Sequence, residues 1–171
     1  MKRILLFSLC ITIVAGVISC HHKSIHCDVK NTVVELFVST DNHQWNNLKK
    51  VFAHQVKLDY SSFTGKKATI LKPDQIIKTW SAFLPKFKYT HHQVSNFKIK
   101  HLSSSKATVF CYGTATHFLP KQVKGNVWTV VGTYNFNLEK KRKLWKITMM
   151  KFNFKYQSGN TSLPRIAMSK K

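Results

Sequence analysis

The spacing of apolar residues changes abruptly at Pro85, and this change constrains the fold more than any other feature of the sequence. Before Pro85 the apolar residues recur at helical spacing, whereas after it they alternate with polar residues over long runs. Alternation places one set of side chains on each face of a strand, so each run predicts a half-buried β-strand. We therefore predict four long strands, the first with an irregularity near Ser95, over residues 87–102, 106–118, 126–139 and 143–156.

Three helices are predicted ahead of these strands. The clearest lies over residues 72–85, where Pro73 stands in the first turn, Ile76 and Trp80 share one apolar face, and Pro85 ends the helix. Helices followed by a meander of strands are typical of an α+β domain. We expect three N-terminal helices packed in the concave face of a strongly curved, mostly antiparallel sheet, forming a cone-shaped α+β barrel with a cavity. Similar patterns predict the two earlier helices and a short strand over residues 25–39, 45–52 and 54–60.

The beginning of the chain is typical of a bacterial lipoprotein. A positive segment, MKR, precedes an apolar run that ends in VISC (17–20), and this ending resembles the lipobox at which such signals are cleaved. We expect a lipid on Cys20 that anchors the protein to the bacterial cell envelope, facing the periplasm. An ordinary secretory signal and an uncleaved anchor are the alternatives. The expected parts are a signal peptide at 1–19, a tether at 20–27, the domain at 28–157 and a flexible basic tail at 158–171.

Two features near the tether leave alternatives open. Cys27 and Cys111 could form a disulfide in an oxidising periplasm, but Cys111 lies in an apolar strand, where a buried free thiol is common. The segment HHKSIHC (21–27) could bind a metal ion, but no second cluster of ligands accompanies it. A polar tether is therefore favoured, and we expect neither a metal site nor a cofactor.

The chain is strongly basic, with 28 Lys and Arg residues, six Asp and Glu residues and a formal net charge of +22. Such a balance favours an anionic partner, although lysines on the outer face of a half-buried sheet can also form a simple solvated surface. The sequence contains no recognisable nucleic-acid-binding motif, so nucleic acid is not expected as a partner. A patch that faces anionic lipid headgroups is the second interpretation.

Four segments spread along the chain resemble a known family. They are similar to SnoaL-like domains of the nuclear transport factor 2-like superfamily, and especially to the scytalone dehydratases. The shared pattern is an Asp four residues before a Trp, a Tyr fifteen residues after that Trp, a Thr-x-His, and a further His 25 residues on. The segments are DNHQWNNLKKVFAHQVKLDYSSF (41–63), THHQVSNF (90–97), ATHF (115–118) and LWKI (144–147).

The resemblance implies a catalytic set of Asp41, Tyr60, His92 and His117 in a cone-shaped pocket. His92 would take a proton next to a carbonyl group, and a β-hydroxyl group would leave as water. Asp41 would hold His117 in one tautomer and favour its charged form, while Tyr60 would donate a hydrogen bond to the carbonyl oxygen. The family intervals select His92 for the pocket, which places its neighbour His91 on the opposite face. Asp41 could instead be the N-cap of the second helix.

Three positions depart from the dehydratase pattern. Thr40 replaces a second tyrosine, and Gly132 and Tyr134 stand where the dehydratases have a serine and an asparagine that contact substrate. These remain expected pocket residues, but they argue against the same substrate. The expected function is a pocket for a small apolar or carbonyl-containing molecule, in a lyase or isomerase or else in a non-catalytic envelope lipoprotein that binds an apolar ligand or a protein partner. In a purely structural protein, Phe110, Tyr134 and Phe152 would fill the cone. A homodimer is expected, since sheets of this fold often pair.

Overall fold

The long strands after Pro85 form most of a six-stranded sheet in the computed structural model, which describes residues 25–169. The order along the sheet is β2-β1-β6-β5-β4-β3, and every neighbouring pair is antiparallel except β1 with β6, which is parallel. The strands are β1 (Phe52–Asp59), β2 (Thr69–Leu71), β3 (Tyr89–Leu102), β4 (Lys106–Phe118), β5 (Val127–Lys141) and β6 (Leu144–Gly159).

Alternation along the strands sorts their side chains between the two faces, as the sequence predicts. On β4 the residues Ala107, Val109 and Cys111 are buried, whereas their neighbours are at least partly exposed. The pairing of β3 with β4 shifts between Ser95 and Lys98, which confirms the irregularity expected near Ser95. The buried face of the sheet is the concave one, and it holds the core.

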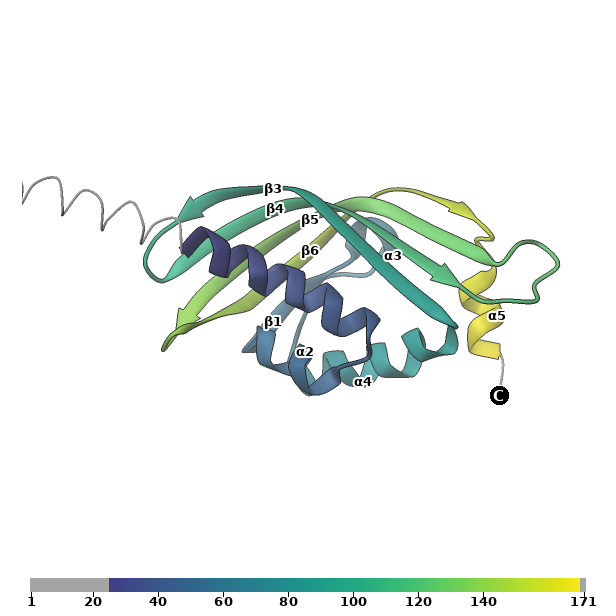
Figure 1. Ribbon diagram of the computed structural model, residues 1–171, viewed down its shortest axis with the longest axis horizontal. Coiled ribbons are helices and arrows are strands. Elements are labelled where there is room, and N and C mark those ends of the chain that lie inside the picture. Colours follow the sequence, from purple (N-terminus) through teal and green to yellow (C-terminus); the bar gives the residue numbers. More distant parts are fainter. Residues whose placement is uncertain (1–24, 170–171) are drawn as a thin grey trace, which may run out of the picture.

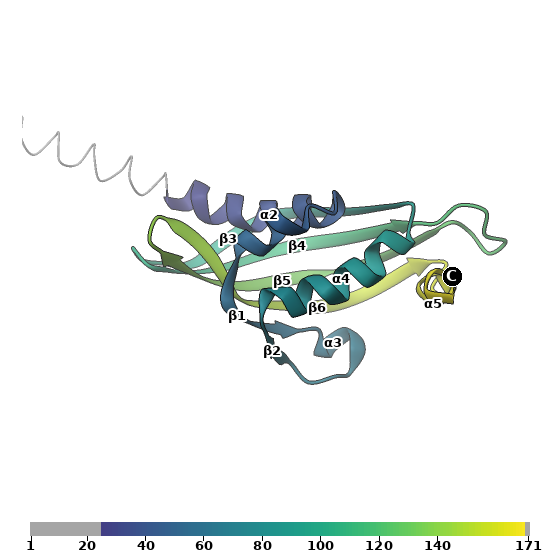
Figure 2. The ribbon, with the colours of Figure 1, turned by 90° about the horizontal axis from the view of Figure 1, so that it is seen from below.

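The helices cover this concave face (Figures 1 and 2). Residues 25–41 are helical, and Val29, Val33 and Leu36, spaced three to four residues apart, are completely buried. Figure 1 shows the sheet arching over this helix, α2 and α4, which confirms the predicted α+β arrangement. The other helical elements are α2 (Trp45–Val51), α3 (Ser61–Thr64), α4 (Pro73–Phe83), the 3₁₀ turn η1 (Leu84–Lys86) and α5 (Leu163–Ser169).

The two ends of the described chain differ from the sequence-based expectation. Residues 25–27, assigned to the tether, are helical, and Ile25 is buried. The expected loose tail instead begins with the last residues of β6 and continues into α5, where Leu163 and Ala167 are buried. Apolar side chains in a short segment are enough to fix it against the sheet, although too few to predict a helix. The expected signal peptide and the lipid site at Cys20 lie outside the described residues.

Two further expectations can be compared with the described part of the chain. Cys27 is exposed and Cys111 is buried, and both are free thiols, so the possible disulfide does not form. Among residues 25–169, no helix has the length and apolar character needed to cross a bilayer.

Candidate functional site

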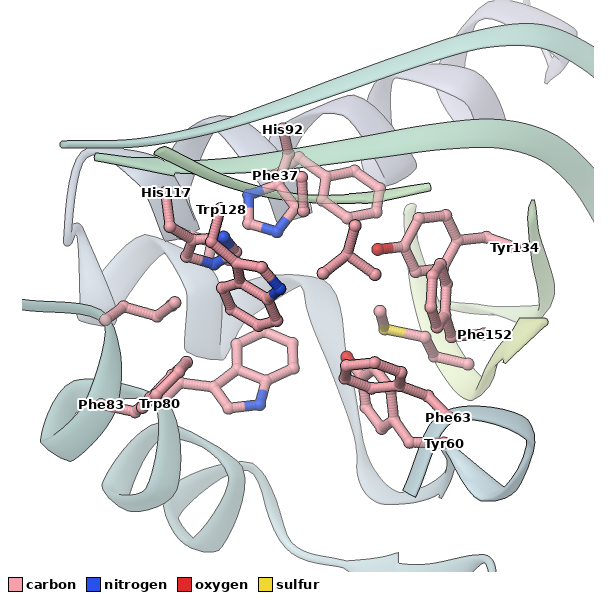
Figure 3. Close-up of a pocket in the computed structure, with 15 residues that line it drawn as sticks. Phe37, Tyr60, Phe63, Trp80, Phe83, His92, His117, Trp128, Tyr134 and Phe152 are labelled. Carbon is pink, nitrogen blue, oxygen red and sulfur yellow. The ribbon is translucent and has the colours of Figure 1, made fainter. Parts of the chain in front are cut away.

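A cavity of about 190 Å³ lies between the helices and the concave face of the sheet (Figure 3). Aromatic side chains make up most of its wall, with two histidines and two tyrosines as the main polar groups. The cone is therefore hollow rather than filled by its own side chains, and Phe110 lies outside it. The lining residues are Phe37, Thr40, Tyr60, Phe63, Trp80, Phe83, Leu84, His92, Ala115, His117, Trp128, Val130, Tyr134, Met150 and Phe152.

His92 lies on the cavity wall and is held by Asp41. Oδ1 of Asp41 is 2.6 Å from Nδ1 of His92, and Oδ2 accepts a hydrogen bond of 2.6 Å from the His92 backbone N–H. The side chains are only 13% and 14% exposed for His92 and Asp41 respectively. Burial raises the pKa of Asp41, but the hydrogen bonds and the charge of His92 outweigh burial and hold this pKa below its usual value. The pair is thus an ionised carboxylate bonded to an imidazole.

The position of Asp41 in its helix shows that the carboxylate is not there to stabilise the helix. Asp41 is the last helical residue of 25–41, where the negative end of the helix dipole disfavours a carboxylate. The N-cap of α2 is Gln44, so the alternative role of Asp41 as that N-cap is wrong. The two donors of His92 offset the unfavourable position.

The expected pairing of Asp41 with His117 is also wrong. His92 pairs across the strands with Ala115, and His117 with Thr90, so the two histidines point into the cavity on a diagonal. Their ring centroids are 6.2 Å apart, and the carboxylate reaches only His92. The end of helix 25–41 lies against β3, at the edge of the sheet, which is why the strand that carries His92 supplies the partner.

His117 is an uncharged, enclosed histidine rather than a charged one. It is 4% exposed and packs against Trp128 and Phe87, with ring centroids 4.5 and 4.8 Å away. Burial lowers the pKa of His117 to about 4, assisted by the neighbouring His92 and opposed by the Trp128 backbone and Asp41. Its Nδ1 has no hydrogen-bond partner among the described residues. A bound molecule could supply the missing partner.

Two tyrosines approach the cavity from the side opposite the histidines (Figure 3). Tyr60 precedes α3, and Tyr134 lies on β5; both line the cavity. Burial raises the pKa of Tyr60, and burial together with the nearby Tyr60 raises the pKa of Tyr134. Both phenols therefore stay protonated and can donate hydrogen bonds to a bound oxygen atom.

Gly132 does not line the cavity, although the resemblance implied that it would. A Cβ atom at Gly132 would lie 2.5 Å from the Phe152 ring, and one at Gly113 would lie 2.2 Å from the Tyr134 ring. The two glycines pair directly across β4 and β5. Together they let both rings lie close to the backbone, so they shape the cavity wall indirectly. Thr40 does line the cavity, but its hydroxyl donates to the Leu36 carbonyl at 2.6 Å.

The remaining polar candidates lie outside the cavity. His91 is exposed on the opposite face of β3 from His92, as alternation requires. Asp59 accepts hydrogen bonds from Ser61 and lies 3.7 Å from Nζ of Lys151. Within the described residues, no three His, Cys, Asp or Glu side chains are grouped so that they could hold a metal ion.

Several wall residues were not expected at the site. Trp80, Trp128 and Phe63 are not among the site residues that the sequence predicts, yet all three line the cavity. Alternation along the strand could have indicated Trp128, because it shares its strand face with Val130 and Tyr134. Phe63 belongs to a single helical turn that carries no periodic pattern.

The chain is similar to a known protein family and to solved structures. The family model for SnoaL-like domains matches residues 25–151 of the chain. No curated protein has a significant sequence match to it.

Three solved structures illustrate the shared fold. The Kfla4162 protein from Kribbella flavida is 22% identical, with a TM-score of 0.77 over 84% of this chain and 99% of that chain. A protein from Novosphingobium aromaticivorans, assigned provisionally as a scytalone dehydratase, is 17% identical, with a TM-score of 0.71 over 82% and 91% of the two chains. The hexachlorocyclohexane dehydrochlorinase LinA type 3 from Novosphingobium barchaimii is 13% identical, with a TM-score of 0.69 over 84% and 94%. At these identities the likeness concerns the fold.

Proposed function

This chain belongs to the SnoaL-like domain family, and we propose that it is a lyase or isomerase in which His92, held by Asp41, moves a proton on a small carbonyl compound. The observation that carries the proposal is the 2.6 Å contact between Asp41 Oδ1 and His92 Nδ1. An ionised carboxylate only accepts hydrogen bonds, so it favours the tautomer with the proton on Nδ1. The lone pair of Nε2 is then available as a base toward the cavity.

The proposed reaction begins when Nε2 of His92 takes a proton from the carbon next to the carbonyl group. The electrons of the broken C–H bond form a C=C bond, and in a lyase the bond to the β-hydroxyl group breaks. The leaving hydroxide takes the proton back from His92 and departs as water, which restores the enzyme. In an isomerase the proton returns to a different carbon. Tyr60 and Tyr134 donate hydrogen bonds to the carbonyl oxygen as it gains negative charge.

The neighbours and the cavity support a small cyclic substrate. A dehydratase and a dehydrochlorinase, as two neighbours are described, remove water and hydrogen chloride respectively. The cavity of about 190 Å³ is somewhat larger than the engineered apolar cavity of about 150 Å³ that binds benzene. With a largely aromatic wall, this volume favours a substrate built on one ring.

A non-catalytic binder is the second candidate, and it is favoured by two positions that lack the free polar group of the dehydratase pattern. The hydroxyl of Thr40 is already bonded to the Leu36 carbonyl, and Gly132 contributes no side chain. The wall therefore offers fewer polar contacts than the dehydratase pattern does, which suits an apolar ligand that is bound without being converted. The expected envelope lipoprotein would then carry such a ligand or present it to a protein partner.

Hydrogen exchange at carbon distinguishes the enzyme from the non-catalytic binder. Cyclic ketones with and without a β-hydroxyl group are incubated with the protein in D₂O, and NMR follows loss of the α-proton and appearance of the alkene. We expect His92→Gln to slow the exchange by at least about 100-fold, the usual contribution of a general base. His91→Gln is the matched control, because His91 is exposed on the opposite strand face, and it should leave the rate unchanged.

Two results would contradict the enzyme. One is exchange at equal rates in the wild type and His92→Gln. The other is tight binding of a ring compound by both proteins without any exchange in the wild type, which would favour the binder.

A further inference from the structure

The loop between β4 and β5 presents an exposed aliphatic side chain between two lysines. Val123 is fully exposed, and Lys121 and Lys124 beside it are exposed as well. Burial of an aliphatic side chain is favourable, so an exposed valine at the tip of a loop contributes no stability through contact with water. In Figure 1 this loop projects from one end of the sheet, beside α5.

Hydrogen bonds hold the loop in the shape that displays Val123. The Gln122 side chain donates to the Pro120 carbonyl at 2.6 Å, and the Gln122 backbone N–H donates to Asn126 Oδ1 at 2.9 Å. From the segment before α5, the Asn160 side chain donates to the Gly125 carbonyl at 2.9 Å. These hydrogen bonds lie on both sides of Val123, and they favour a preorganised loop with an exposed tip.

Further exposed basic and aromatic side chains lie on the elements next to the loop. The backbone N–H of Lys88 donates to the Phe118 carbonyl at 2.8 Å, immediately before the loop, and Nζ of Lys88 lies 5.6 Å from the centre of the Tyr89 ring. Tyr89 is 64% exposed, and Arg165 on α5 is exposed too. We call this surface the loop face, and its residues are Lys88, Tyr89, Lys121, Val123, Lys124 and Arg165.

The loop face carries only positive charge. Asp59, Asp74 and Glu139 form ion pairs with Lys151, Lys49 and Lys141, none of which belongs to the loop face, and the remaining carboxylates of the described chain belong to helix 25–41. Of those, Asp41 shares a surface cleft with Lys88 and Tyr89, but both of its oxygens are bonded to His92. No acidic group of the described chain therefore neutralises the lysines of the loop.

We propose that the loop face docks on a bilayer surface that contains anionic phospholipids, with Val123 entering the headgroup region. Lysines and arginine attract the anionic headgroups, while valine and tyrosine gain from burial at the boundary with the acyl chains. A nucleic acid would use the lysines but would leave Val123 without a role, because bases stack on aromatic or arginine side chains.

Docking of the loop face would also bring the cavity close to the bilayer. His117 and Trp128 pair across the strands directly beside the last pair before the loop, and both line the cavity. Small apolar molecules dissolve in the bilayer, so this position suits a cavity with an aromatic wall. The docking itself does not depend on the proposed reaction.

The test measures binding to vesicles by co-sedimentation. Residues 4–19 are apolar enough to bind lipid by themselves, so the experiment uses residues 21–171, which contain every described element. Vesicles of phosphatidylcholine alone are compared with vesicles that also contain phosphatidylglycerol. We expect binding to the anionic vesicles only, weakened by salt.

Two variants with matched controls locate the binding surface. Lys121→Gln with Lys124→Gln should weaken binding on the order of 20-fold, from the attraction of two cations to the surface, and Val123→Gln roughly 10-fold. The controls are Lys57→Gln with Lys78→Gln, on β1 and α4, and Leu144→Gln at the start of β6; these positions are exposed and lie outside the loop face, so binding should be retained within about 2-fold.

Three outcomes would overturn the proposal. They are absence of binding to the anionic vesicles, equal losses in the loop variants and their controls, and binding to duplex DNA that Val123→Gln leaves intact while vesicle binding is absent. Circular dichroism spectra that match the wild type show that a lost interaction is not a lost fold.

Discussion

The enclosed, uncharged state of His117 should make the stability of the fold depend on pH. Burial lowers the pKa of His117 to about 4 in the folded chain, whereas an unfolded histidine has a pKa of about 6.5. Between these values the unfolded chain binds a proton that the folded chain excludes. The stability associated with His117 is therefore complete above about pH 6.5 and is lost as the pH falls toward 4.

The size of this effect follows from the two pKa values. Each unit of difference changes the free energy of unfolding by about 1.4 kcal/mol, so the full loss below both pKa values is about 3 kcal/mol. At pH 4.5 most of that loss has developed, and we expect roughly 2 to 3 kcal/mol relative to pH 7.5. Asp41 adds to the acid sensitivity at lower pH, because its contribution starts to be lost near the ordinary pKa of 3.8 and is gone only below its lowered pKa.

The assay is urea unfolding of the wild type and His117→Gln at pH 7.5, 6, 5 and 4.5. The substitution changes the baseline stability, so the quantity of interest is the difference between the two proteins as a function of pH. This difference should shift by roughly 2 to 3 kcal/mol in favour of the variant at acid pH. A difference that stays constant across the range would show that His117 titrates normally and would refute its enclosure.

Two other predictions concern the cavity wall and the thiols. Gly113→Ala should destabilise the fold by about 1 to 3 kcal/mol in thermal or urea unfolding, since the new methyl group would meet the Tyr134 ring at 2.2 Å; unchanged stability would mean that the ring moves freely. In the native protein iodoacetamide should label Cys27, which is exposed, but not Cys111, because burial raises the pKa of its thiol to about 12. Labelling of Cys111 without denaturant would contradict its burial.

The sequence predicts the long elements well because their signals are repetitive. The strand expected at 106–118 is β4, Lys106–Phe118, since alternation runs through it and turn residues bound it on both sides. Short elements such as α3 and β2 lack such a signal. Their position depends on contacts with β6 and β1, which are distant in sequence.

The site is predicted only in part, because some of its contacts also join residues that are distant in sequence. Intervals along the chain and alternation indicate that His92 and His117 face the same side, and both line the cavity. They do not determine which of the two histidines is in contact with Asp41, because the histidines are diagonal neighbours on adjacent strands. That choice depends on where the end of helix 25–41 rests on the sheet, a tertiary contact between residues that are 51 positions apart.

The proposed function depends on Asp41 fixing His92 with its proton on Nδ1, so that Nε2 is a free base at the cavity. Two-dimensional ¹H–¹⁵N NMR of the imidazole, at a pH where the ring is neutral, reports the tautomer directly. We expect a protonated Nδ1 and a bare Nε2 in the wild type, and loss of this preference in Asp41→Asn. A wild-type ring with its proton on Nε2 would contradict the role of His92 as a base.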